Sequence, residues 1–255
     1  MNRFKLGIYL CLFFIPFLLS CSNDEGNLLN PKYLLSEINR HDAVTDDITY
    51  VDEYVYDSDD NLILIKGFRT RNLSEIDRVL FKYNELNELT SIRHEGGGSF
   101  YELQVTKDNG EVTVKGWDQP HKVVFHYNED NMITSKEVWY NNSMPNIFNF
   151  TYNNQRQMVE FEQNIGSLAP KIVKFDNYVD SNLFPFPVYI GTFGELEFII
   201  THSFNLKLGE NGVPTTSSGN VEFSKFEYDI DKHKNISKMY LNFNNIFSFK
   251  YKRAD

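Results

Sequence analysis

Residues 125–133 read FHYNEDNMI, and the same pattern recurs at 54–62 (YVYDSDDNL), 81–89 (FKYNELNEL) and 150–158 (FTYNNQRQM). Each copy holds an aromatic residue and a Tyr two positions apart, then Asp or Asn, four turn-type residues and an apolar residue. Residues two apart lie on the same face of a strand, and Asp or Asn can bond the backbone two residues further on and so begin a turn. The unit therefore predicts a β-hairpin.

A turn of this kind needs one residue in the left-handed backbone conformation, which Asn and Asp tolerate better than most residues. Four positions after the Tyr, three copies have Asp60, Asn87 and Asn131, while the fourth has Arg156, which breaks the rule. A fifth copy, FEYD at 226–229, reaches its apolar residue two positions later than the others. The repeat predicts five hairpins, of which the last is irregular.

Other segments alternate apolar and polar residues or run apolar, and they predict the strands between these hairpins: 101–105 and 112–114 around the Asn-Gly turn at 109–110, 123–127, 172–175, 195–204, 221–223 and 245–251. Residues 33–40 fit either a first strand or a short helix. We expect roughly fifteen strands and an all-β antiparallel meander of repeated hairpins, closed into a large barrel-like or strongly curved sheet. Because Lys, Asp and Glu interrupt short apolar alternations, the sheet is predicted to be water-soluble.

The first residues have the pattern of an export signal. Arg3 and Lys5 precede an apolar run at 6–19 that is short for a membrane-spanning helix. Residues 18–21, LLSC, resemble the lipobox of bacterial lipoproteins. We therefore expect a lipoprotein signal peptide at 1–20, palmitate-type acylation of Cys21, a lipidated polar tether at 21–30 and a single all-β domain at 31–255. The SNDE run at 22–25 fits either a cell-surface export signal or a plain tether.

Composition limits the chemistry. Residues 21–255 keep 23 basic and all 35 acidic side chains, a net charge of −12, which argues against a general nucleic-acid-binding surface. The two cysteines are Cys11, in the predicted signal, and Cys21, under the predicted lipid. The mature domain therefore has no disulfide, thiol nucleophile or cysteine-held metal, and we expect no cofactor.

Patterns that would indicate catalysis or metal binding are weak. Residues 57–61, DSDDN, imitate the start of a calcium loop, but the later Gly and Glu of an EF-hand are missing, and a hairpin turn explains the same residues. The six histidines are scattered and are predicted to lie at the surface. Glu195 and Glu197, expected on one face of a strand, are the best carboxylate pair for glycoside cleavage.

Two aromatic stretches are the best candidates for ligand binding: Trp139 and Tyr140 before an Asn-rich loop, and Phe184, Phe186 and Tyr189 in a Pro-rich stretch. Exposed rings stack on sugars or anchor partner proteins. The alternative is that these rings close one end of the core.

The hairpin units resemble the tyrosine–aspartate repeats of bacterial surface and toxin proteins, although the usual turn glycine is absent. The chain is more similar to lipoproteins whose domain of unknown function is described as a porin-like β fold, through the lipobox, the hairpins, the Phe175-Asp176-Asn177 element and the late hairpin at 226–229. The resemblance covers most of the mature chain and implies no catalytic residues.

From these patterns we expect a lipid-anchored, non-catalytic binding or structural module on the outer membrane, facing the periplasm or the outside. Its partners would be the membrane, through the lipid, and a glycan or protein ligand, but not nucleic acid. The alternative is a carboxylate-dependent hydrolase that acts on glycan or peptide at the mouth of the barrel.

Overall fold

A computed structural model describes residues 33–71, 74–96, 99–116, 122–140, 144–181, 194–219, 226–241 and 245–254. In these ranges the chain forms one antiparallel sheet of sixteen strands and one helix. The first eight strands are β1 (Tyr33–His41), β2 (Ile48–Tyr56), β3 (Leu62–Arg69), β4 (Ser74–Tyr83), β5 (Leu89–Gly96), β6 (Ser99–Asp108), β7 (Glu111–Lys115) and β8 (Lys122–Tyr127). The rest of the chain contributes β9 (Ile133–Trp139), β10 (Asn146–Tyr152), β11 (Met158–Asn164), β12 (Lys171–Val179), α1 (Gly194–Phe204), β13 (Val213–Gly219), β14 (Phe226–Ile230), β15 (Ile236–Leu241) and β16 (Asn245–Arg253).

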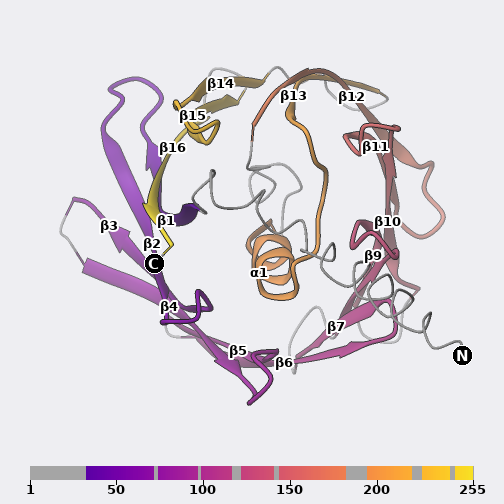
Figure 1. The fold of residues 1–255 in the computed structure, drawn as a ribbon, viewed down its shortest axis with the longest axis horizontal. Coiled ribbons are helices and arrows are strands. Elements are labelled where there is room, and N and C mark those ends of the chain that lie inside the picture. The colour runs from indigo at the N-terminus through magenta and orange to yellow at the C-terminus, as the bar shows by residue number, and fades with distance from the viewer. Residues whose placement is uncertain are drawn as a thin grey trace, which may run out of the picture.

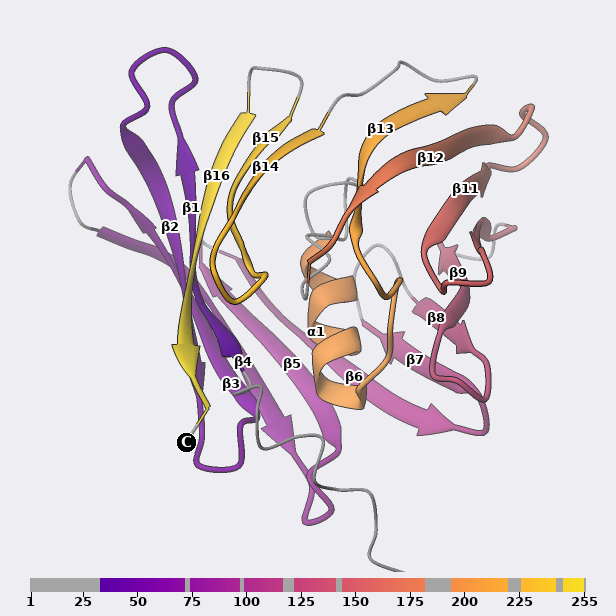
Figure 2. The ribbon, with the colours of Figure 1, turned by 45° about the horizontal axis from the view of Figure 1, so that its top comes forward.

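The sheet curls into a nearly closed barrel around α1 (Figures 1 and 2). Each strand pairs with the next one along the chain except β13 with β14, and β1 also pairs with β16. The gap in the barrel therefore lies between β13 and β14. The predicted all-β meander of hairpins is confirmed, and residues 33–40, left open between strand and helix, lie in β1. The predicted strand at 221–223 lies outside the described residues.

Five hairpin turns share one hydrogen-bonding pattern. A side-chain oxygen of Asp or Asn accepts bonds of 2.8–3.1 Å from the backbone N–H groups two and four residues further on. The five residues that cap the turns in this way are Asp57, Asn84, Asn128, Asn153 and Asp231. The side chain thus satisfies two backbone donors that the narrow turn leaves without a strand partner.

The residue three positions after each cap has a positive φ of 58–64°. Asp60, Asn87 and Asn131 confirm the sequence prediction, and Arg156 adopts the same conformation although its residue type does not favour it. The irregular fifth hairpin is also explained. Its cap is Asp231 and not Asp229, because β14 continues for two more residues before the turn begins.

Tyrosine hydroxyls connect successive hairpins. Six of them donate hydrogen bonds of 2.6–2.9 Å to backbone carbonyls 14–21 residues earlier in the chain: Tyr56 to Leu35, Tyr83 to Leu62, Tyr152 to Ile133, Tyr178 to Met158, Tyr228 to Pro214 and Tyr251 to Ile236. In four pairs the acceptor is the apolar residue that opens the return strand of a capped hairpin. The bond from Tyr228, on β14, to Pro214, on β13, crosses the gap in the barrel.

The predicted strand at 195–204 is wrong, because this segment is α1. Ile200 and Phe204, four residues apart, are both buried, as the period of a helix requires. Inside a ring of paired strands, an extended segment would have no partner for its backbone groups, whereas a helix satisfies its own. No helix among the described residues is long and apolar enough to cross a membrane.

The two faces of the sheet differ in polarity. The inner face packs Ile38, Ile65, Ile92 and other apolar side chains together with those of α1 in one core cluster. On the outer face a row of directly paired charged residues crosses six adjacent strands, from Lys250 through Glu37, Glu53, Lys66 and Arg78 to Glu95. This part of the outer wall is therefore strongly hydrophilic.

The first prediction concerns the tyrosine bonds. Replacing Tyr152 by Phe keeps the buried ring and removes only the hydroxyl that donates to Ile133. We expect a loss of about 0.5–1.5 kcal/mol in the free energy of unfolding, measured by urea denaturation. Tyr127→Phe is the matched control, because Tyr127 packs against the same core without such a bond among the described residues. Equal losses in the two variants would contradict a stabilising role for the bond.

Alkaline pH should destabilise the fold through the same residues. Burial, with a contribution from Asp176, raises the pKa of Tyr178 to about 12, and burial also raises the pKa of Tyr152. The unfolded chain releases these protons near pH 10, so the stabilisation is complete below pH 10 and is lost as the pH rises toward 12. The urea midpoint should therefore fall between pH 9 and 11, and by less in Tyr178→Phe. An equal fall in both proteins would contradict this assignment.

Candidate functional site

A polar cavity of about 440 Å³ lies between the C-terminal part of α1 and the turn that joins β2 to β3. Its lining is almost entirely polar: Asp59, Asp60, Asn61, Tyr83, Thr201, His202, Ser203 and Asn205. Ligand sites typically have volumes of a few hundred Å³, and this one combines carboxylate, amide, hydroxyl and imidazole groups. It offers many hydrogen-bonding positions to a small polar ligand.

Contacts across the cavity hold α1 against the barrel wall. The His202 ring approaches the carbonyl oxygen of Asp60 through Nε2, at 3.3 Å, and meets the Tyr56 ring edge-on with centroids 5.4 Å apart. The hydroxyls of Ser203 and Tyr83 lie 3.2 Å apart. The cavity is therefore lined by the β2–β3 turn, by Tyr83 at the end of β4 and by α1, and α1 is about 140 residues from the turn in sequence.

The segment that follows α1 is tied to two other capped turns. The backbone N–H of Lys207 donates to the carbonyl oxygen of Asn131, and the Lys207 carbonyl oxygen accepts a hydrogen bond from the backbone N–H of Ile133. The backbone N–H of Glu210 donates to the carbonyl oxygen of Arg156. The Arg156 guanidinium also pairs with Glu210 and with Asp130, at 3.3 and 3.0 Å. These bonds explain how Arg156 is held at a turn position where Asn or Asp would be expected. They also fix the segment after α1 against the neighbouring turns.

The cap beside the cavity is ionised. Burial acts to raise the pKa of Asp57, but hydrogen bonds from Asn61 and from the backbone of Asp59 outweigh it, so the pKa is lowered. Burial raises the pKa of Tyr83, which therefore stays a neutral hydroxyl at physiological pH. The rim thus keeps a negative charge beside neutral donors.

A second polar cluster lies on the inner wall, near the opposite ends of the same strands. The Tyr50 hydroxyl donates to Asp77 at 3.1 Å, and burial together with the charges of Asp52 and Asp77 raises the pKa of Tyr50. Gly67 and Gly96 flank Asp77 on the neighbouring strands. A Cβ on Gly67 would lie 1.9 Å from the Asp77 carboxylate, so glycine is required for this arrangement.

Basic and aromatic groups surround these carboxylates. The Arg40 guanidinium lies 3.8 Å from the Asp52 carboxylate and 4.9 Å from the centre of the Tyr50 ring. The His94 ring is stacked on Tyr101, with centroids 4.8 Å apart, and its buried Nδ1 has no hydrogen-bond partner. Tyr50 and Tyr56 are six residues apart on β2, so this cluster lies about 20 Å from the cavity.

The predicted aromatic site residues are only partly described. Trp139 lies on the outer wall, where its indole N–H donates to Glu137 at 2.9 Å and Lys122 faces its ring at 4.7 Å. Tyr140 packs instead against the core, so the structure does not bring these two rings together. Phe184, Phe186, Tyr189 and the predicted lipidation site Cys21 lie outside the described residues. Ligand binding by these aromatic residues stays a prediction.

The structure also decides between earlier alternatives for charged residues. The hydrogen bonds of Asp57 show that residues 57–61 form a capped turn, and no group of three or more potential metal ligands gathers in the described part of the chain. Glu195 and Glu197 lie on α1 and not on a strand, so the expected shared strand face is wrong. Surface placement is also wrong for His41, whose side chain is 9% exposed because it packs between strands and a turn.

Sequence reasoning missed the cavity residues on α1, because 195–204 was interpreted as a strand. The available signal was the spacing of Ile200 and Phe204, which fits a helical face, but the apolar run 198–200 supports a buried strand equally well. The carboxylates of the inner cluster were also missed, since nothing local distinguishes Asp52 and Asp77 from charged residues on the outer face.

Comparison with known proteins supports the fold. No protein-family model matches the chain, and no curated protein matches it. Among solved structures, a porin-like protein from Bacteroides uniformis superposes with a TM-score of 0.57 at 12% identity, covering 86% of this chain and 98% of that one. A porin-like protein from Bacteroides vulgatus covers the same shares at 11% identity, with a TM-score of 0.41. The first likeness shows that the barrel-like β fold is shared.

Proposed function

We propose that this protein is a lipid-anchored binding module on the outer membrane that takes a small polyhydroxylated ligand, such as part of a glycan, into the cavity beside α1. The observation that carries the proposal is the cavity itself. It has the size of a ligand site, and its lining of carboxylates, amides and hydroxyls matches the donors and acceptors of a sugar. The cavity carries out no chemistry of its own in this proposal.

The outer wall supports an attachment through lipid alone. Charged residues on the lipid-facing side of a membrane barrel cost about 2–4 kcal/mol each for Lys or Arg near the midplane. The row from Lys250 to Glu95 places Lys66, Arg78 and three glutamates on this wall. A barrel with such a surface is stable in water, and the lipobox-like Cys21 would supply its membrane attachment.

The hydrolase alternative rested on a strand that would place Glu195 and Glu197 on one face, and this segment is the helix α1. The inner cluster of Asp52 and Asp77 retains a pair of carboxylates, but Tyr50 and Arg40 already occupy them through a hydrogen bond and an ion pair. Binding is therefore the function that the interior supports best.

Glycan binding can be tested with the purified chain on an array of bacterial and host glycans, followed by calorimetry with the best-bound oligosaccharide. Asp59→Ala removes an exposed carboxylate of the cavity rim and should weaken binding about tenfold or more, since a hydrogen bond to a charged group contributes about 1.5–3 kcal/mol. Glu129→Ala is the matched control, because it removes an exposed carboxylate from another capped turn, away from the cavity. Equal affinities of the two variants would exclude the cavity as the binding site.

The lipid anchor is tested separately. Cys21→Ala removes the only thiol of residues 21–255, so it should abolish incorporation of a palmitate analogue and release the protein from the membrane fraction. Cys11→Ala is the control, because it changes a thiol within the predicted signal and should leave labelling intact. Label retained by Cys21→Ala would show that the anchor has been assigned to the wrong residue.

A further inference from the structure

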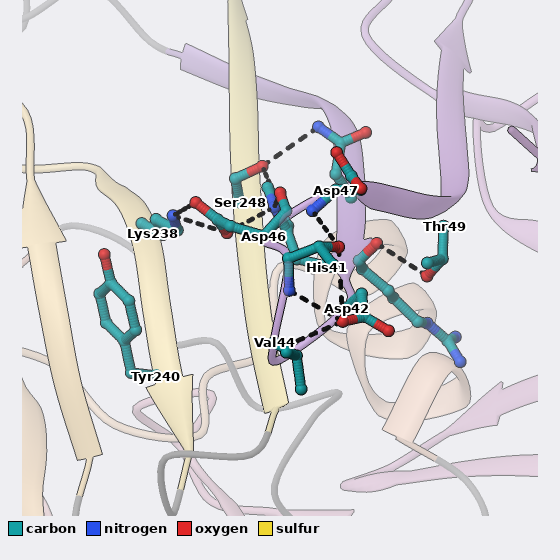
Figure 3. A network of polar contacts seen from close by, with 12 residues as sticks. His41, Asp42, Val44, Asp46, Asp47, Thr49, Lys238, Tyr240 and Ser248 are labelled. Atoms are coloured by element: carbon teal, nitrogen blue, oxygen red, sulfur yellow. Dashed lines mark hydrogen bonds and ion pairs between the residues drawn. The ribbon is translucent and has the colours of Figure 1, made fainter.

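A serine, a histidine and an aspartate form a hydrogen-bonded chain on the outer wall (Figure 3). Ser248 lies on β16, and its hydroxyl oxygen is 2.8 Å from Nε2 of His41, at the end of β1. The other ring nitrogen, Nδ1, is 3.0 Å from the backbone carbonyl oxygen of Asp46 and also 3.0 Å from its carboxylate, in the turn between β1 and β2. Such an arrangement is recognised by its geometry and not by sequence position.

The turn that carries Asp46 is itself well ordered by hydrogen bonds. The Asp42 carboxylate accepts the backbone N–H groups of Val44 and Thr45 at 2.9 and 3.0 Å, and Asp46 donates its own to the Asp42 carbonyl oxygen. Asp46 has a φ of 58°. The carboxylate that faces His41 is therefore fixed by the backbone of its own turn.

The charge on Asp46 favours one tautomer of His41. Two hydrogen bonds from Lys238, at 2.9 and 3.1 Å, lower the pKa of Asp46, and His41 adds to this effect. The backbone carbonyl and the ionised carboxylate of Asp46 can only accept hydrogen bonds, so Nδ1 of His41 carries the proton and donates it to Asp46. Nε2 is then a lone-pair acceptor that faces the Ser248 hydroxyl, as a general base must.

Ser248 is flanked by two hydrogen-bond donors in the same row of the sheet. Asn39 on β1 and Lys238 on β15 are its direct cross-strand partners. The Asn39 amide nitrogen donates to the serine oxygen at 3.2 Å. Asn39 is completely buried, and its Oδ1 has no hydrogen-bond partner. A buried acceptor without a partner lowers the stability of the fold, which a purely structural asparagine would not be expected to do. Asn39 thus holds the serine oxygen in a fixed position beside Nε2 of His41.

We propose that Ser248 is an activated nucleophile that reacts with carboxylic esters, with His41 as its general base and Asp46 and Asn39 as positioning residues. The serine oxygen bonds to the ester carbonyl carbon, and its proton passes to Nε2 of His41 and then to the departing alcohol as the ester C–O bond breaks. Water, deprotonated by His41, then hydrolyses the acyl-serine. The net reaction converts an ester and water into a carboxylic acid and an alcohol.

The test uses the full-length chain in detergent and a biotinylated fluorophosphonate, with which an activated serine forms an O–P bond and releases fluoride. We expect stoichiometric labelling, mapped by mass spectrometry to Ser248, and slow hydrolysis of p-nitrophenyl acetate. Ser248→Ala should abolish both. His41→Gln should slow labelling about 100-fold or more, the usual contribution of a general base.

Ser237→Ala is the matched control, because Ser237 lies on the adjacent strand with its hydroxyl bonded only to the backbone carbonyl of Asp229. It should be labelled as fast as the unchanged protein. Thermal midpoints of all variants show whether they are folded, and if His41→Gln unfolds, Asp46→Asn replaces it, with slower labelling and a changed pH profile of labelling as the readout. Absence of label on Ser248 in the folded protein, or equal labelling of His41→Gln, would overturn the proposal.

Discussion

The side-chain cap of Asp57 and its four counterparts is the interaction on which the barrel depends. Each cap closes a five-residue turn, and the register of the two strands follows from that turn, so that Tyr56 pairs with Leu62 and Tyr152 with Met158. Register decides which face of a strand enters the core. Because the same cap recurs, the apolar faces of successive hairpins point to the same side, and the tyrosine hydroxyls reach the carbonyls of the preceding hairpin.

This dependence explains why so much of the fold is predictable from sequence. A side-chain cap, a residue in the left-handed conformation and a strand of alternating polarity are local features that each involve fewer than ten residues. All three can be recognised in the sequence of residues 54–62. Arg156 is the informative exception. Its conformation is imposed by the turn, and its side chain is held by Asp130 and Glu210, which no local pattern connects to it. Tertiary context overrides residue preference there.

The functional groups are less predictable because they are assembled from distant parts of the chain. The cavity needs α1, and α1 exists as a helix because it lies inside a barrel whose strands already satisfy each other's backbone groups. Its own sequence does not decide between strand and helix. His41 and Ser248 are 207 residues apart and meet only because β1 pairs with β16. Unless the order of the strands is known, nothing in the sequence indicates that a histidine and a serine so far apart are in contact.

The filling of the barrel determines where chemistry can take place. Among the described residues, apolar side chains of the sheet pack together with those of α1 in the middle of the interior. The polar clusters described above lie near the two ends of the strands and on the outer wall, whereas the buried Lys136 lies among the apolar side chains, with its ammonium 4.4 Å from the centre of the Phe148 ring. At one end, Gly67 and Gly96 have no side chains and so leave room for the hydrogen-bonded pair of Tyr50 and Asp77. At the other end, the cavity lies between α1 and the β2–β3 turn. A shared barrel fold does not by itself imply a shared function, because function depends on the side chains that line each site.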